Sequence, residues 1–442
     1  MPWPWVRTPP GPPKQINRKD VCMQLPFISL HYLNTDLGSP KQSRLNEIRE
    51  LSNISSSSWL IRNELGFYIG RYEDVTAILK DKRWHHGLLR LLTMEMGLDP
   101  EIENDRRKVL FSLEGEEHTR LKKHISRALR HNSQSICQSL SKEIIHSVRD
   151  KTEIDIISEI IFAYPSSVIS SVLGIPKNDW PFMDEISGQL IKYFEGNVSE
   201  FSKDSSDAAI RLYVYLKDLF ASLRKTPDEN NVISEMLKSQ EEAGLSDFDL
   251  VIIIGSLYGG GVDTTRCQLG LIFDYFLSNP GSYEDFSSRY LAKLAKGADD
   301  LLPFLRTMIE EISRLNPTIR GSVRYASEDI EYKNIKFPKG TFLFLGYASA
   351  NMDESIREKA ELVDFELAEI HHYQDLTFGA GTHKCPGASL AMQQAVSLLQ
   401  RFIHTFSCVE RNGEPTYRES GASVFGPNSL PVRLTKRKES KE

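Results

Sequence analysis

The chain has 442 residues, of which 40% are hydrophobic and 26% are charged. This composition is ordinary for a soluble globular protein, and it excludes collagen-like, disordered and disulfide-scaffold classes. The 54 basic and 60 acidic residues leave a formal net charge of −6, so bulk electrostatics do not indicate a nucleic-acid-binding protein. The length alone allows roughly three domains of about 150 residues or one large enzyme core.

The cysteines are few and widely spaced. Their odd number and the absence of any C-x-x-C spacing are typical of a reducing compartment, and they argue against a structural zinc site or a disulfide framework. An odd cysteine leaves room for a reactive or metal-ligating thiol. The five are Cys22, Cys137, Cys267, Cys385 and Cys408.

No segment predicts a membrane anchor or a secretory leader. The longest apolar run, Leu250 to Val262, covers 13 residues and contains four glycines, which is too short to span a bilayer. The first residues, Met1 to Arg7, contain no apolar stretch of the roughly 7–15 residues that a signal peptide needs. The expectation is a cytoplasmic protein.

In chain order, residues 1–18 carry six prolines and predict an extended arm. Residues 66–81 predict a short strand pair leading into a helix. Strand signals return at 319–347 and 423–434. Because strands and helices do not alternate regularly, a doubly wound sheet is not expected, and the pattern indicates a mainly α chain with small β-sheets. The expected helices cover 117–150, 154–173, 206–224, 246–278 and 300–315.

The segment 246–278 breaks the usual rules for a helix. Ser246 to Asp249 form a capping-box pattern, yet three glycines, 259–261, follow in mid-helix at a cost of up to about 1 kcal/mol each. One interpretation ends the helix at the glycines and makes Asp263 the cap of a second helix. In the other, Thr264 bonds back to the Gly260 carbonyl, opening a groove for a flat ligand beside an acid and a hydroxyl.

The most specific segment is the glycine-rich loop 377–388, which contains Cys385 and precedes an apolar-periodic helix. A cysteine at a helix N-terminus is stabilised as the thiolate, which is the form that binds metal. The alternative is a cysteine that only packs as a small hydrophobic residue.

The spacing Phe378-x-x-Gly381-x-x-x-Cys385-x-Gly387 resembles the haem-thiolate loop of the cytochrome P450 family. Further segments that resemble the family's motifs occur in the family's order between about residue 60 and residue 434. Residues 260–265 resemble the family's oxygen-binding helix motif, 311–314 its E-x-x-R pair, and 117–122 the bacterial E-H-T-R-L-R segment. Residues 324–329 and 429–433 match two later segments.

The resemblance implies the cytochrome P450 fold, with one catalytic domain over 19–442 after the arm 1–18. Haem b is expected between the long oxygen-binding helix and the helix after the cysteine loop. Cys385 is then the axial thiolate and metal ligand, while Asp263 and Thr264 are the acid and alcohol that deliver protons. Without the resemblance, His118 and His383 would be interpreted as ordinary loop residues, and Lys122 and Arg324 as solvated cations. The other implied cofactor-binding residues are His118, Lys122, Gly260, Arg324, Phe378, His383 and Gly387.

The resemblance also implies a monooxygenase that inserts one atom of O2 into an apolar organic molecule by hydroxylation or oxidative dealkylation. Electrons would come from a separate ferredoxin or flavodoxin with its reductase. A cluster of basic residues is either the docking patch for that partner or a solvated face. The alternative function is a non-catalytic haem-thiolate ligand-binding or sensor protein. The basic cluster comprises Arg120, Lys122, Lys123, Arg127, Arg130 and Lys384.

Some positions depart from the family pattern. Lys122 stands where an arginine is usual, so a point charge replaces a planar fork. Met352 also replaces a frequent arginine. Near Asp364 and Phe365 the arginine that usually completes the Glu–Arg network is missing, and Glu369 stands close to that position. The partners that hold Arg314 are therefore left open.

Overall fold

The computed structural model describes residues 26, 41–95, 110–130, 133–191, 198–228, 231–297, 301–363, 374–418 and 424–438. The proline-rich arm 1–18 lies outside these residues. So do Asp364, Phe365 and Glu369.

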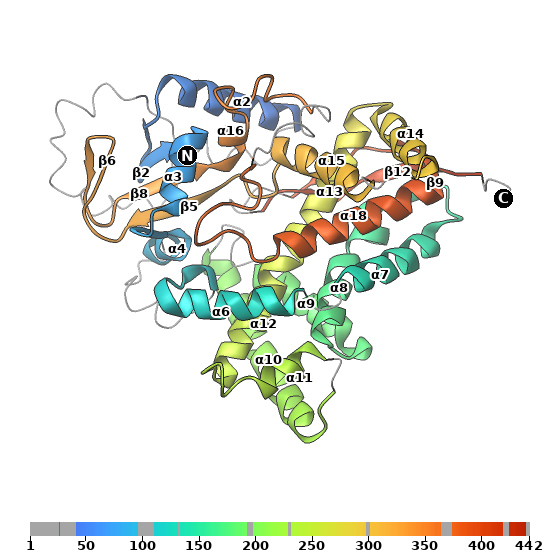
Figure 1. The fold of residues 1–442 in the computed structure, drawn as a ribbon, viewed down its shortest axis with the longest axis horizontal. Coiled ribbons are helices and arrows are strands. Elements are labelled where there is room, and N and C mark those ends of the chain that lie inside the picture. Colours follow the sequence, from blue (N-terminus) through green and yellow to red (C-terminus); the bar gives the residue numbers. More distant parts are fainter. Residues whose placement is uncertain are drawn as a thin grey trace.

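Helices dominate the described chain (Figure 1), as the sequence predicted. The expected helix 117–150 is two helices, α6 and α7, and the start of 154–173 is a short strand followed by a π-helical turn, Ile157–Ile161. No helix among the described residues is long and apolar enough to cross a membrane. The α-helices are α2 (Lys41–Ser57), α3 (Tyr72–Lys80), α4 (Leu88–Glu95), α6 (Gly115–Ala128), α7 (Ser133–Val148), α8 (Tyr164–Leu173), α9 (Trp180–Ile191), α10 (Val198–Lys225), α11 (Val232–Lys238), α12 (Asp247–Gly261), α13 (Asp263–Ser278), α14 (Ser282–Ala295), α15 (Leu301–Leu315), α16 (Tyr347–Asn351) and α18 (Ala388–Thr405).

The strands form small sheets. The largest has the order β1-β2-β8-β5-β3 and lies at one side of the molecule (Figure 1); β2 and β8 pair in parallel, and its other pairs are antiparallel. The remaining sheets are β4-β12-β9 and the pairs β6-β7 and β10-β11. The strands are β1 (Ile61–Arg62), β2 (Gly66–Ile69), β3 (Trp84–His86), β4 (Glu153–Asp155), β5 (Gly321–Ala326), β6 (Ile330–Tyr332), β7 (Ile335–Phe337), β8 (Phe342–Gly346), β9 (Phe406–Arg411), β10 (Thr416–Tyr417), β11 (Pro427–Ser429) and β12 (Pro431–Lys436).

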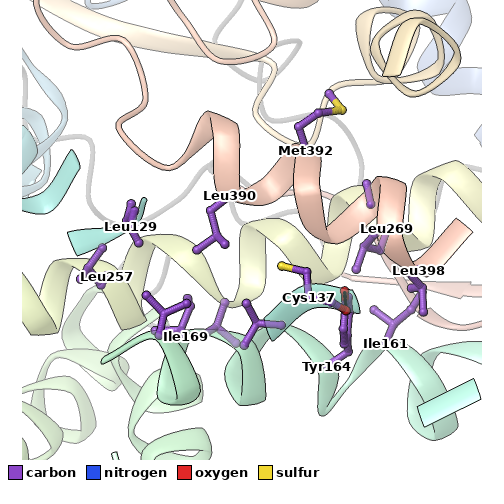
Figure 2. Packing of buried hydrophobic residues seen from close by; sticks show 14 of the residues in the cluster. Leu129, Cys137, Ile161, Tyr164, Ile169, Leu257, Leu269, Leu390, Met392 and Leu398 are labelled. Carbon is purple, nitrogen blue, oxygen red and sulfur yellow. Dashed lines mark hydrogen bonds between the residues drawn. The ribbon is translucent and has the colours of Figure 1, made fainter. Parts of the chain in front are cut away.

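One large apolar core joins the helices around α12, α13 and α18. Leu257 of α12 and Leu269 of α13 belong to the same buried cluster as Leu390 and Leu398 of α18 (Figure 2). Burying each such side chain contributes about 1.5–3 kcal/mol. The helix that follows the cysteine loop and the expected oxygen-binding helix therefore belong to one shared core.

The helix predicted over 246–278 is interrupted in its middle. The helix α12 ends at Gly261 and α13 begins at Asp263, with both running in line through the molecule (Figure 1). The Thr264 hydroxyl donates to the Gly260 carbonyl at 2.7 Å, which confirms the expected back-bond. The glycines do end a helix, as the other interpretation held, but the N-cap of the second helix is Val262 and not Asp263, which is already the first residue of α13. Glycines and a competing hydroxyl together loosen the backbone ladder here.

Candidate active site at the cysteine loop

The backbone of the cysteine loop requires its glycines. Gly379 and Gly381 have φ of +64° and +68°, a left-handed conformation that side chains disfavour. A Cβ on Gly381 would also lie 1.9 Å from the Leu79 carbonyl oxygen. The Cys385 N–H donates to the Phe378 carbonyl at 2.9 Å, which closes the loop. The spacing seen in the sequence is thus the spacing of a tight, glycine-dependent turn.

Cys385 lies just before α18, and Gly387 is the N-cap of that helix. The residue is exposed, but the protein packed around its sulfur raises the pKa of the thiol, while the N–H groups of Gly387 and Ala388 and the charge of Lys122 act in the opposite direction. The sulfur therefore faces helix-end amides and a cation, which are groups that stabilise a thiolate.

Three of the expected site residues, His118, His383 and Arg324, lie together with His86 of β3 and with Glu114. The rings of His118 and His383 lie 4.4 Å apart, and His86 lies 5.6 Å from His383. The Glu114 carboxylate accepts the backbone N–H of His86 at 2.8 Å and lies 3.0 Å from His383 Nε2. Arg324 is the cross-strand partner of His86. Sequence reasoning missed His86 and Glu114, although Glu114 stands four residues before His118.

Burial lowers the pKa of two histidines of this cluster. Burial, His383 and Lys122 lower the pKa of His118 to about 4. Burial and the charge of Arg324 hold the pKa of His86 well below its usual range. Among the described residues, Nδ1 of His86 and Nδ1 of His118 are buried without a hydrogen-bond partner. The cluster thus offers ring nitrogens beside a buried arginine, a setting that suits an anionic carboxylate.

Lys122, one turn after His118 on α6, reaches the cysteine loop. Its Nζ donates to the Thr382 carbonyl at 2.5 Å. Burial lowers the pKa of the Lys122 ammonium, as does the charge of Lys384, while Cys385 raises it. Lys122 thus links the histidine cluster to the cysteine.

The acid and the alcohol at the helix break have separate contacts. Asp263 is buried; its Oδ1 lies 2.9 Å from Arg266 and 3.3 Å from Arg418. The Thr264 hydroxyl is bonded to the Gly260 carbonyl. A Cβ on Gly260 would meet no atom within 4 Å, so the helix exposes bare backbone to open space at this point. A flat ligand can approach the helix there, next to the Thr264 hydroxyl.

Arg314 is held by a buried network that includes an arginine not expected from the sequence. Its guanidinium lies 3.2 Å from Glu311 and donates to the carbonyls of Asn351, Ala360 and Leu362. Arg357 completes the network, because it donates to both Glu311 oxygens at 2.5 and 2.8 Å. Arg357 thus supplies the second guanidinium of this network, which the sequence left open. Met352, at the other departure, is buried against Ile48 and Ala348.

This geometry can be compared with known proteins. Residues 66–433 match the family model described as Cytochrome P450. The chain belongs to the cytochrome P450 family. It is accordingly an enzyme of the P450 monooxygenase type, whose cofactor is haem bound through a cysteine thiolate.

The relatives match over most of their length. Luteothin monooxygenase of Streptomyces thioluteus is 23% identical over 93% of this chain and 96% of that protein. The polyketide biosynthesis cytochrome P450 PksS of Bacillus subtilis (strain 168) is 25% identical over 83% of this chain and 89% of PksS. The solved structure of CYP109E1 from Bacillus megaterium in complex with corticosterone has a TM-score of 0.74 at 19% identity, covering 89% and 99% of the two chains. The last comparison supports the fold, which is the P450 fold expected from the sequence.

The described residues fit a haem. The porphyrin is flat and carries two carboxylates, and its iron needs an axial thiolate. The chain offers a cysteine among helix-end amides, an uncovered helix backbone at Gly260, and unpartnered buried nitrogens on His86 and His118. These features lie on four distant parts of the sequence, which one cofactor would hold together.

Arg357→Met is expected to destabilise the folded protein by about 2–3 kcal/mol, because the buried Glu311 loses two charge-assisted hydrogen bonds and keeps Arg314 alone. The control is Arg306→Met, which breaks an exposed pair with Glu310 at 2.8 Å and should cost less than about 1 kcal/mol. Urea unfolding of both variants measures the difference. Arg357→Lys should be intermediate, since lysine keeps the charge but lacks the bidentate fork. Equal stability of the Arg357→Met and Arg306→Met variants would contradict this role of Arg357.

Proposed function

We propose that this chain is a haem-thiolate monooxygenase that inserts one oxygen atom of O2 into an apolar organic small molecule, by hydroxylation or oxidative dealkylation. The observation that carries the proposal is Cys385, held at the start of α18 by a glycine-dependent loop and facing the Gly387 and Ala388 amides. Haem bound there supplies the activation of O2. The residues of the chain position that group, deliver protons and select the substrate.

Each expected cofactor residue has a proposed role. Cys385 would hold the haem iron through its thiolate. His118 and His383 would be hydrogen-bond partners of the propionates, with Arg324 and Lys122 as the neighbouring cations; His86 joins this set because its Nδ1 is buried and unpartnered. The three remaining residues allow close approach or pack against the macrocycle: Gly260, Phe378 and Gly387.

Protons are delivered at the helix break. The Thr264 hydroxyl lies beside the open backbone of Gly260, and Asp263 is the adjacent residue. We infer that Thr264 donates a hydrogen bond toward the oxygen-binding side and that Asp263 replenishes its proton. A protein that only binds ligands has no use for such a pair, so the pair favours the enzyme over a sensor.

The substrate side is formed by segments that the fold brings together. The Phe425 N–H donates to the Thr318 carbonyl at 2.9 Å, and the Arg320 guanidinium lies 5.2 Å from the Phe425 ring. Tyr258 of α12 is fully buried, and its hydroxyl is hydrogen-bonded to Ser170 at 2.7 Å. Since PksS serves polyketide biosynthesis and CYP109E1 binds corticosterone, we propose a bulky apolar substrate with a few oxygen functions.

The electron donor docks on the side of Cys385 away from the substrate. A depression of about 290 Å³ above this residue is lined by Lys122, Arg130 and Lys384, among others. Arg120 and Arg127 of the expected patch are engaged within the protein, by Asp249 at 3.6 Å and Glu235 at 2.8 Å. We therefore centre the proposed site for an acidic ferredoxin or flavodoxin on Arg130 and Lys384.

The reduced, CO-bound protein is expected to show the red-shifted Soret band of a thiolate-ligated haem. Cys385→Ser should abolish that band because the soft thiolate is lost. Cys408→Ser is the matched control, since Cys408 lies on β9 and is not in the loop. Absorption spectroscopy of reduced, CO-treated protein is the measurement. A band that survives Cys385→Ser would overturn the assignment.

Thr264→Ala is expected to divert electrons from water and product to hydrogen peroxide, because O–O cleavage needs protons that the hydroxyl passes on. Product or water per electron pair should fall by at least about tenfold, within the range of general acid–base effects. Thr265→Ala is the control; Thr265 makes the same back-bond, to Gly261 at 2.7 Å, but is buried. Peroxide and O2 are measured during NADPH oxidation. Unchanged peroxide release in Thr264→Ala would exclude the relay.

Charge reversal of Arg130 and Lys384 together is expected to raise the KM for a ferredoxin by about fivefold to tenfold and to weaken its salt dependence, because two attractive charges become repulsive. Lys336→Glu, on the distant hairpin β6-β7 (Figure 1), is the control. Steady-state reduction kinetics at several salt concentrations measure the effect. If all three proteins share one KM and one salt slope, the partner docks elsewhere.

A further inference from the structure

Asp263 is held by two arginines that come from different elements. Arg266 lies three residues further along α13, with Nη1 at 2.9 Å from Oδ1. Arg418 follows β10 near the C-terminus and places Nη2 at 3.3 Å from the same oxygen. The Asp263 side chain is only 4% exposed, so both contacts act on a nearly dehydrated carboxylate. Interactions of this kind are far stronger than surface pairs.

Asp263 is not the only carboxylate that Arg266 binds. It also forms an ion pair with Asp184 of α9, donates from Nε to the Phe162 carbonyl at 2.6 Å, and stacks over the Phe162 ring at 4.2 Å. Two carboxylates thus share this guanidinium. Arg418 supplies the second positive charge that the pair requires, because a buried carboxylate without sufficient compensation is costly.

The approach of Arg418 is fixed by the segment that carries it, the hairpin of β10 and β11. This hairpin lies along one face of α13: Gly426 packs against Cys267, Pro427 against Gly270, and the Tyr417 hydroxyl donates to Asp274 at 3.0 Å. Positions 263, 267, 270 and 274 recur at helical spacing on that face. The Arg418 N–H donates to the Gly426 carbonyl at 3.0 Å, which anchors its backbone.

The same hairpin segment reaches the substrate side. Phe425 precedes Gly426, stacks on Tyr417 with centroids 5.7 Å apart, and is hydrogen-bonded to Thr318. The Arg418 backbone is therefore hydrogen-bonded to the residue that directly follows Phe425. Asp263, the acid of the proposed relay, is thus connected to Phe425 through Arg418 and Gly426.

We propose that Arg418 is a positioning residue for the proton relay: with Arg266 it fixes the Asp263 carboxylate at the break between α12 and α13, and it couples that carboxylate to the hairpin that carries Phe425. The proposal rests on the relay through Thr264 and Asp263. Each proton that Asp263 passes to Thr264 is replaced from solvent, so the carboxylate returns to the same ion pairs. Arg418 itself touches neither O2 nor substrate in this role.

The test uses the haem-loaded protein with a [2Fe–2S] ferredoxin, its reductase and NADPH, and no organic substrate. Electrons then leave as hydrogen peroxide, which takes two per O2, or as water, which takes four and requires O–O cleavage. Arg418→Gln should raise the peroxide share by about twofold to tenfold, because small misplacements of a catalytic group are costly. It should also change the solvent isotope effect in the same direction as Asp263→Asn. Arg418→Lys should restore part of the water formation.

Two further measurements test the two parts of the proposal, the action through Asp263 and the coupling to the hairpin. In the Asp263→Asn background, Arg418→Gln should add nothing, because the residue acts through Asp263. Amide hydrogen exchange of residues 424–430 in the resting protein should rise in Arg418→Gln. Exchange should stay unchanged in Arg433→Gln, which breaks an exposed pair with Glu153 at 3.0 Å.

Additive effects in the double variant, or a wild-type peroxide share and isotope effect in Arg418→Gln, would overturn the positioning role. If Thr264→Ala and Asp263→Asn also leave the peroxide share unchanged, the proposed relay itself is wrong. If those two variants respond and Arg418→Gln does not, only the role of Arg418 is lost.

Discussion

The buried contact between Glu311 and its two arginines is the constraint on which the cysteine side of the site depends. Arg314 binds the carbonyls of Asn351, Ala360 and Leu362, and its own carbonyl accepts from the Asn351 side chain at 3.2 Å. Asn351 Oδ1 in turn accepts the Leu376 N–H at 2.8 Å, two residues before Phe378. A chain of buried polar contacts thus connects α15 to the loop that carries Cys385 and fixes the position of that loop. Such chains specify geometry because each unsatisfied member would be costly.

A second constraint is the break between α12 and α13, where the chain departs from good helix chemistry. Three glycines and a back-bonding threonine weaken the ladder, while the flanking helices are secured by a large apolar core. The local instability is therefore confined to about one turn. That turn is where bare backbone, a hydroxyl and a carboxylate come together, so the sequence is least regular where the proposed chemistry takes place.

The parts that the sequence predicted are those set by local rules. The cysteine loop needs its glycines because its backbone has positive φ and passes close to Leu79. The Thr264 back-bond spans only four residues. Arg357 could not be assigned in this way, because its partner Glu311 is 46 residues away and the pairing depends on how the intervening strands return to α15. His86 was missed for the same reason: it joins the cluster through the register of β3 against β5. Long-range pairing leaves no signal in the spacing of one chain.

The same distinction explains the electrostatics of Asp263. In the sequence it is an acid beside an alcohol, and that description suffices to suggest a proton relay. In the fold it is also one of two carboxylates, with Asp184, that share Arg266, and it meets Arg418 from a segment about 150 residues away. The acid is therefore not an independent donor: its charge is balanced by α9, by its own helix and by the C-terminal hairpin. A movement of α9 or of the hairpin would change the ion pairs around Asp263, which is the physical basis of the coupling proposed between the hairpin and the proton relay.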